Sequence, residues 1–217
     1  MILTSLFIGL FIGTFILFDY ILGLFHVKGC YYINHFIANS IIVYNTFYCV
    51  NNSYTLLCEK NINCNNNDLS KSIIYALHFY HILWYSKKMR FDDWLHHIIM
   101  IFIIMPITVF TDCPNIAGHV FFFLIGLPGG IDYLLLFLVR NNIMSRIKEK
   151  QINRGLNLWI RCPGCIASCV LIYSTIKQNT YDIVSICSYI IMFAIYWNGI
   201  YFMEQTVSNY AIEIYKK

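Results

Sequence analysis

An all-α, polytopic integral membrane helix bundle is the fold class that this sequence predicts, and three observations predict it. Hydrophobic residues make up 59% of the 217 residues, and charged residues only 12%. The mean hydropathy is +0.60. Apolar runs of membrane-spanning length recur along the whole chain. A water-soluble domain has about one-quarter charged residues and cannot bury this much apolar surface, so the composition argues against a soluble fold.

Seven apolar runs are each long enough for one transmembrane helix, which needs about 20 residues. Only a helix or a closed barrel satisfies its backbone hydrogen bonds across lipid, and runs of this length predict helices. The first run lacks the basic start and small-residue cleavage site of a signal peptide, so we expect it to remain as a span. The runs cover residues 3–25, 35–57, 69–86, 94–111, 116–139, 156–176 and 183–203.

The count of seven depends on the third run, 69–86, which is the shortest. If this run is a loop, the chain has six spans instead of seven. In both cases the spans leave only short connections, so residues 1–217 form a single transmembrane domain without a soluble module.

Basic residues predict the orientation, because Lys and Arg stay on the cytosolic side of short loops. With seven spans, one side of the membrane carries Lys28, Lys87, Lys88, Arg90, Arg140, Arg146, Lys148, Lys150, Arg154, Lys216 and Lys217. The other side carries Lys60, Lys71 and Lys177. We therefore expect a lumenal or extracellular N-terminus and a cytosolic C-terminus. The six-span alternative also leaves residues 87–92, 140–154 and the C-terminal tail in the cytosol.

Three cysteines fall on the predicted lumenal side, where oxidation can occur: Cys58, Cys64 and Cys113. One disulfide among them is expected as often as none, and the sequence leaves its pairing open.

Ionisable residues within the spans gather at one depth. At 1.5 Å per residue, His96 and His97 lie about 6–9 Å inside the cytosolic end of the fourth span. Residues at similar depth in other spans are His78, His81, Asp132, Asp19 and Arg161. Such residues are costly in lipid unless they face the bundle interior, so we expect a shared polar cavity that opens to the cytosol. The alternative is structural, with Arg161 paired to Asp132 or Asp19 to hold helices together.

The densest chemistry lies in the segment from Phe91 to His97. Asp92 precedes His96 by four residues, and Asp93 precedes His97 by four, so each carboxylate can meet an imidazole on one helix face. A carboxylate next to a histidine fixes its tautomer and raises its basicity, which suits a general base. A satisfied structural histidine pair is the competing interpretation.

This segment resembles the TLC-domain family, the TRAM, LAG and CLN homology proteins that include ceramide synthases. The similar residues are Tyr85-Ser86-Lys87-Lys88-Met89-Arg90-Phe91-Asp92-Asp93 followed by His96-His97, and later Gly130-Ile131-Asp132-Tyr133-Leu134-Leu135. The resemblance covers residues 70–200. Ceramide synthases carry an additional His-Asp just before the last Asp of the second motif, where this chain has Pro128-Gly129-Gly130.

The resemblance implies a protein that makes, binds or senses membrane lipids, with the endoplasmic reticulum as the implied membrane. The ceramide synthase form of that activity joins an acyl group from acyl-CoA to a sphingoid amine, so acyl-CoA is the implied co-substrate and no bound cofactor is expected. For such a reaction we assign catalytic roles to His96, His97, Asp93 and Asp132. Substrate-binding roles fall to His78, His81, Tyr85, Arg161 and Asp19.

Other function classes also fit parts of this pattern. A non-enzymatic lipid binder, transporter, scramblase or ion channel would also need a polar intramembrane cavity. Membrane di-iron enzymes use more histidines than this chain has, and the sequence predicts no metal, although His78, His81, His96 and His97 are a candidate single-metal set. Cys162-Pro163-Gly164-Cys165 has redox spacing but more simply marks a helix kink. Membrane lipids are the expected partners, nucleic acid is not, and homo-oligomerisation stays open.

Overall fold

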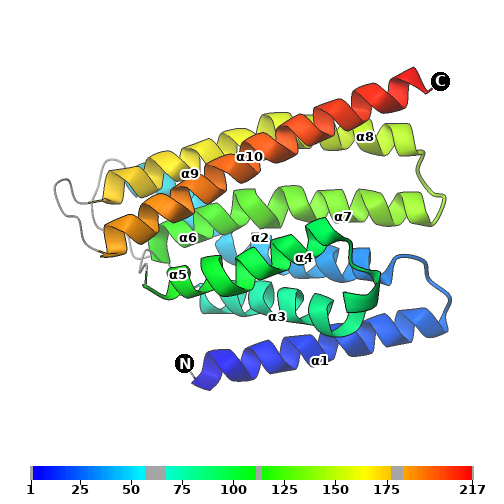
Figure 1. Cartoon of the computed structure of the whole chain (residues 1–217), viewed down its shortest axis with the longest axis horizontal. Coiled ribbons are helices and arrows are strands. Elements are labelled where there is room, and N and C mark those ends of the chain that lie inside the picture. The colour runs from blue at the N-terminus through cyan, green and yellow to red at the C-terminus, as the bar shows by residue number, and fades with distance from the viewer. Residues whose placement is uncertain (1, 57–66, 111–113, 177–182, 217) are drawn as a thin grey trace.

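The computed structural model describes residues 2–56, 67–110, 114–176 and 183–216, and nearly all of them are helical. Seven continuous helical stretches run side by side as one bundle within this described part (Figure 1). Their elements are α1 (Ile2–Leu24), α2 (Cys30–Leu56), α3 (Asp68–Tyr85) with η1 (Ser86–Lys88), α4 (Phe91–Ile99), η2 (Met100–Ile104), α5 (Met105–Phe110), α6 (Pro114–Phe121), η3 (Phe122–Gly126), α7 (Leu127–Arg140), α8 (Arg146–Leu156), η4 (Asn157–Arg161), α9 (Cys162–Thr175) and α10 (Ile183–Tyr215).

Five of these stretches are long and apolar enough to cross a membrane: Ser5–Leu24, Phe91–Thr108, Ile116–Arg140, Arg146–Ser174 and Ile183–Tyr215. The chain is therefore a membrane-embedded helical protein, as its sequence predicts. Helices α2 and α3 are not among the five, so the count of seven spans is not confirmed. Both helices bury polar side chains inside the bundle, such as Asn34, Asn39 and His81, and these lower their hydropathy.

Several boundaries differ from the sequence prediction. The segment 140–154, expected as a loop, is mostly helix α8, which continues without a break into η4 and α9. Helix α2 begins at Cys30, five residues before the predicted start, and α10 continues to Tyr215 beyond the predicted end at 203. Hydropathy misses these ends because polar helix extensions read as loops. The candidate lumenal cysteines Cys58, Cys64 and Cys113 lie outside the described residues.

Three π-helical turns interrupt the longer stretches, and each ends two residues before a proline. The turn η2 precedes Pro106, η3 precedes Pro128, and η4 precedes Pro163. Proline has no N–H to donate, and its ring clashes with the carbonyl four residues earlier. A wider π turn accommodates this conflict without ending the helix, and such turns are frequent at functional sites.

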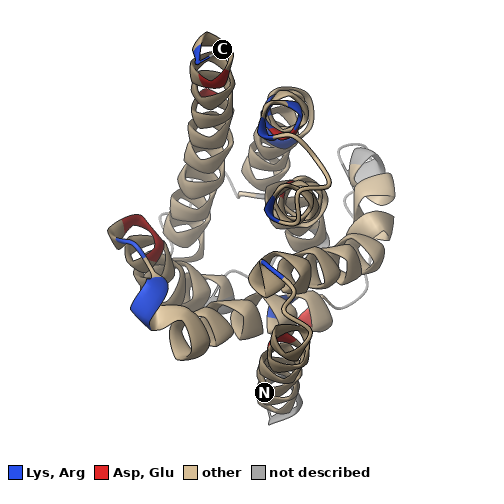
Figure 2. Cartoon of the chain, turned by 90° about the vertical axis from the view of Figure 1, so that its right-hand side faces the viewer, with Lys and Arg blue, Asp and Glu red and all other residues tan. Residues whose placement is uncertain are grey.

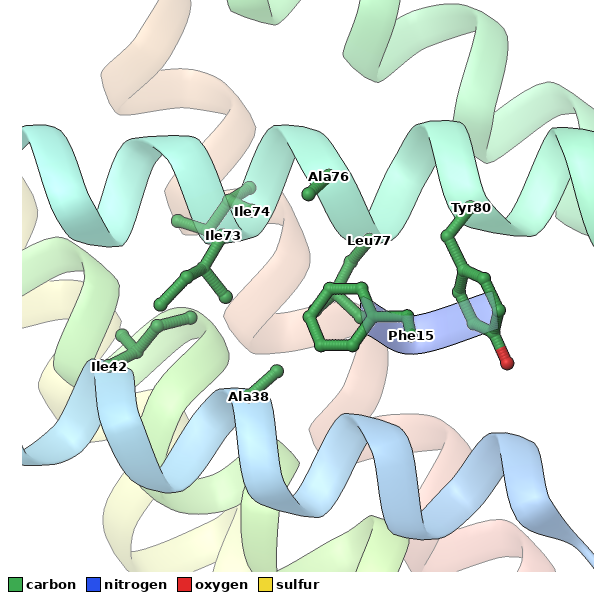
Figure 3. Packing of buried hydrophobic residues seen from close by; sticks show 8 residues of the cluster. All are labelled: Phe15, Ala38, Ile42, Ile73, Ile74, Ala76, Leu77 and Tyr80. Carbon is green, nitrogen blue, oxygen red and sulfur yellow. The ribbon is translucent and has the colours of Figure 1, made fainter. Parts of the chain in front are cut away.

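Apolar side chains from α1, α2 and α3 fill one core between these helices. Phe15 of α1 lies against the layer formed by α2 and α3, where Ile42, Ile73 and Leu77 are buried (Figure 3). A second core joins α6, α9 and α10 around Cys165. The first core holds together α2 and α3, which carry three of the histidines described below.

One end of the bundle collects the described basic segments. The turns at 25–29, 86–90 and 141–145 and the C-terminal end of α10 lie together at the right of Figure 1. Seen from that end, Lys and Arg positions mark the helix ends that face the viewer (Figure 2). This basic end agrees with the charge asymmetry of the sequence.

Candidate functional site

Five histidines from three helices form one connected group, the histidine cluster: His35 of α2, His78 and His81 of α3, and His96 and His97 of α4. On α3 the two histidines are one turn apart, so they point to the same side. On α4, His96 and His97 are adjacent and follow the first turn of the helix, whose N-terminus is closed by a capping box. Both helices meet at η1, at the basic end of the bundle.

The closest polar contact in the cluster joins His81 Nδ1 to His97 Nε2 at 3.0 Å. Both side chains are buried, with 7% and 4% exposed surface. His96 is exposed on the outer side of the cluster. The ring of His35 lies 4.5 Å from that of His81. The rings of His35, His81 and His97 are therefore shielded from bulk water, whereas His96 is not.

The hydrogen bonds also fix which ring nitrogens are free. His78 Nδ1 donates to the carbonyl oxygen of Ile74 at 2.8 Å, so in the neutral ring its Nε2 carries the lone pair. Three buried ring nitrogens have no hydrogen-bond partner: His78 Nε2, His81 Nε2 and His97 Nδ1. Buried polar atoms without partners are rare, and they mark places where a ligand or reactant can bind.

Two tyrosines that sequence reasoning did not assign to the site complete its wall. The Tyr31 ring stacks on His81 at 4.5 Å and lies 4.3 Å from His35. The Tyr133 ring lies 4.2 Å from His35. Tyr31 precedes His35 by four residues, and Tyr133 adjoins Asp132, so helical spacing around these residues was the available signal.

Asp19 lies next to the cluster rather than within it. Its carboxylate accepts hydrogen bonds from the hydroxyls of Tyr80 and, at 2.6 Å, Tyr85. Asn34 in turn donates to the Tyr80 hydroxyl at 3.0 Å. The Tyr85 ring also touches Tyr31, which links this group to the histidines. The predicted residues Asp19 and Tyr85 are thus brought together by a direct hydrogen bond.

Asp93 has a different partner from the one expected. Its carboxylate accepts a hydrogen bond from the backbone N–H of Arg90 at 3.0 Å. The same carboxylate forms an ion pair with the side chain of Arg90. This contact is part of a capping box at the start of α4. His97 is instead bonded to His81, so Asp93 positions the helix that carries the histidines, and His81 orients the ring.

Asp132 of α7 contacts a second polar group, whose residues lie on α8 and η4. Glu149, Asn153, Asn157 and Arg161 follow one another at intervals of four residues and are all buried, and we call them the α8 stripe. Asn153 Nδ2 donates to Asp132 Oδ1 at 2.6 Å. The sequence prediction placed Glu149 and Asn153 in a loop and gave Asn157 no role within its span, so three of the four stripe residues were missed. The repeated interval of four was the signal.

Arg161 lies at the inner end of the α8 stripe, over the ring of Phe202 at 4.6 Å. Within the described part of the chain no ion pair joins it to Asp132 or Asp19, the two partners that the structural interpretation expected. Its Nε atom is buried without a hydrogen-bond partner. Among the residues that the structure describes, Arg161 therefore forms neither of the ion pairs that the structural interpretation expected.

Two further sequence features take structural roles. His119 bonds to the hydroxyl of Ser168 at 2.8 Å, away from the cluster. Cys162 and Cys165 are free and buried, and Cys165 packs against Gly199. The Cys-Pro-Gly-Cys segment thus follows a π turn and forms a helix contact, and its interpretation as a kink stays a prediction.

No protein-family model, curated protein or solved structure matches this chain. Function is therefore inferred from the side chains themselves.

The pair of His81 and His97 supports acid–base chemistry. In a neutral pair one ring donates and the other accepts, so the two outer nitrogens offer one lone pair and one N–H. The cluster can thus take a proton at one end and give one at the other.

Proposed function

We propose that this chain is a TLC-like lipid-handling protein of the membrane, and that the His81–His97 pair is its reaction centre. The observation that carries this proposal is the 3.0 Å hydrogen bond between two buried imidazoles in a membrane-embedded helix bundle. Ionisable residues are costly inside a membrane protein, and they are retained there chiefly for function or for pairing.

The reaction that fits this pair is transfer of an acyl group from acyl-CoA to a lipid amine. The amine nitrogen attacks the thioester carbonyl carbon, and the carbon–sulfur bond breaks. The lone-pair nitrogen of the imidazole pair takes the proton from the amine, and the N–H at the other end gives a proton to the leaving thiolate. Imidazole suits both steps, because it exchanges protons near neutral pH.

The surroundings of the pair support a donor that arrives from the cytosol. Lys87, Lys88 and Arg90 flank α4 at the basic end, where they suit the phosphates of CoA or anionic lipid head groups. On this proposal the basic end faces the cytosol and the N-terminus faces the lumen or the exterior. The endoplasmic reticulum is the membrane that the TLC resemblance implies. His96 and Tyr31 then border the acyl path, and all seven helical stretches span the bilayer.

A second candidate function is a non-enzymatic lipid transporter, scramblase or ion channel. The α8 stripe favours it, because four buried polar residues in line along one helix suit a polar path through the bundle. Asp132 lines the same path through Asn153. In this case the histidines would bind rather than transform the lipid.

The experiment that tests the enzyme is an acyl-transfer assay with the purified full chain in proteoliposomes. Short and long acyl-CoA donors are offered with a sphingoid base, and products are measured by mass spectrometry. We expect His97→Ala to lower the rate by about 10²- to 10⁴-fold while the protein stays folded. His119→Ala is the control, because it removes a buried imidazole that is outside the cluster. If the unmutated chain gives no lipid product with any donor, the enzyme proposal fails, and the transporter, scramblase or channel function takes its place.

A further inference from the structure

We propose that His78, His96 and His97 form a tris-histidine site for a transition metal ion of the zinc type, with His81 orienting His97 from outside the coordination shell. The inference goes beyond the proposed function. It concerns the same cluster, but it depends on ring geometry and not on any lipid reaction. It also departs from the sequence prediction of no metal.

The three rings have the mutual spacing that a tetrahedral ion requires. Their centroids are 5.4 Å apart for His78 and His96, 5.2 Å for His78 and His97, and 5.3 Å for His96 and His97. With metal–nitrogen bonds of about 2.0–2.1 Å, an imidazole centroid lies about 3.2 Å from the ion, so two rings at a tetrahedral angle have centroids about 5.2 Å apart. The observed triangle is therefore nearly equilateral and of the right size.

The ligand nitrogens also converge. One ring nitrogen from each of His78, His96 and His97 lies within 4.8 Å of the others. A tetrahedral ion holds such nitrogens about 3.4 Å apart. The rings therefore need to turn about their Cβ–Cγ bonds to bring these nitrogens closer together. Because this turn moves the nitrogens and not the centroids, it leaves the packing of the cluster in place.

The hydrogen bonds prepare two of the rings as ligands. His78 donates its Nδ1 proton to the Ile74 carbonyl, which leaves the buried Nε2 free to bind an ion. A backbone carbonyl on the second nitrogen is the usual support of a metal-binding histidine. His97 Nδ1 is also buried without a partner. It becomes a ligand when His97 Nε2 donates its proton to His81 Nδ1, so His81 selects the binding tautomer.

The donor set indicates the class of ion. Three neutral imidazoles suit zinc, iron, copper or nickel, whereas magnesium and calcium prefer oxygen ligands. Three histidines with one open position are the arrangement of a catalytic zinc ion. The exposed side of His96 gives access to that position. An ion here would act as a Lewis acid. It would bind the lone pair of His97 Nδ1, which could then no longer accept a proton.

Metal content of the full chain tests the proposal without any lipid assay. The protein is purified in detergent with a tag that contains no histidine, stripped with chelator, and loaded with Zn²⁺ or Co²⁺. We expect about one ion per chain by elemental analysis, and the visible absorption of tetrahedral Co²⁺. Retention of less than about one-tenth of an ion per chain, or only an octahedral Co²⁺ spectrum, overturns the site.

Variants of single histidines give the matched comparison. Loss of His78 or His97 by change to Ala is expected to abolish binding, and His81→Ala to weaken it by about 10- to 100-fold as an outer-sphere change. His26→Asn is the control, because this exposed residue has a φ of 56° that Asn tolerates. If a ligand variant does not fold, the Co²⁺ spectrum of the unmutated chain still decides the question. Equal binding by His97→Ala and His26→Asn shows adventitious metal and contradicts the proposal.

The outcomes separate this inference from the proposed function. A bound ion in a protein without lipid activity supports the metal site and contradicts the acyltransferase. Full lipid activity in a protein that takes up no Zn²⁺ or Co²⁺ on loading overturns the metal site and supports the imidazole pair as base.

Discussion

The contact between Gly164 and Phe123 gives a prediction with a built-in control. A Cβ added at Gly164 would lie 2.3 Å from two ring carbons of Phe123 and 2.7 Å from its Cβ. Ordinary contact begins near 3.4 Å, so the ring must move by about 1 Å, and it is held by His119 at 4.8 Å and Phe122 at 4.9 Å. Overpacking of this kind costs about 1–3 kcal/mol of the free energy of unfolding.

Gly155 lies in the same continuous helical stretch, yet a Cβ there would meet nothing within 4 Å. Gly155→Ala should therefore be neutral or should stabilise the helix by up to about 1 kcal/mol. The two variants should differ by about 1–4 kcal/mol, and at about 2–4 °C per kcal/mol for a chain of this size their melting temperatures should differ by about 2–16 °C. Thermal unfolding in detergent measures this difference. Equal melting temperatures would refute the close packing of α6 and η3 against α9.

Three further predictions concern the polar groups and the orientation. Asp19→Asn should lower the free energy of unfolding by about 1–3 kcal/mol in thermal melts, because one carboxylate oxygen now serves two tyrosine hydroxyls; unchanged melting would contradict this. Lys150→Met should cost about 3 kcal/mol, since the carboxylate of Glu149 is 1% exposed and loses its cation, whereas Lys148→Met on the exposed side should cost little; similar losses for both would count against the buried pair. Cysteines placed at Lys88 and Lys148 should react with impermeant thiol reagents from one side of the membrane only, and labelling from opposite sides would exclude the proposed orientation.

The helical stretches could be predicted from hydropathy, because membrane-length apolar runs leave little choice of fold. Each of the seven predicted runs overlaps a helix. The boundaries at Arg146 and Tyr215 could not be predicted in the same way, because α8 and the end of α10 are polar outside and depend on neighbouring helices. The π turns had a sequence signal in Pro106, Pro128 and Pro163, but proline alone does not say whether a helix ends or widens.

The candidate site was predicted in part. Depth counting brought His78, His81, His96 and His97 to one level, and these four do meet. The same counting also grouped Asp19 and Arg161 with them, although rotation about the helix axis sends these two to other neighbours. Partner choice depends on this rotation and on packing. A spacing of four residues therefore suggested Asp93 for His97, whereas the neighbouring helix supplies His81.

A double-mutant cycle on His81 and His97 tests the central claim most directly. The acyl-transfer rate per folded molecule is measured for His81→Gln, His97→Gln and the double variant in the proteoliposome assay. If the hydrogen-bonded pair acts as one unit, each single change lowers the rate by about 10²- to 10⁴-fold, and the double variant is no slower than the slower single variant. Losses that multiply in the double variant, or full activity in either single variant, would contradict the claim that this pair is the reaction centre.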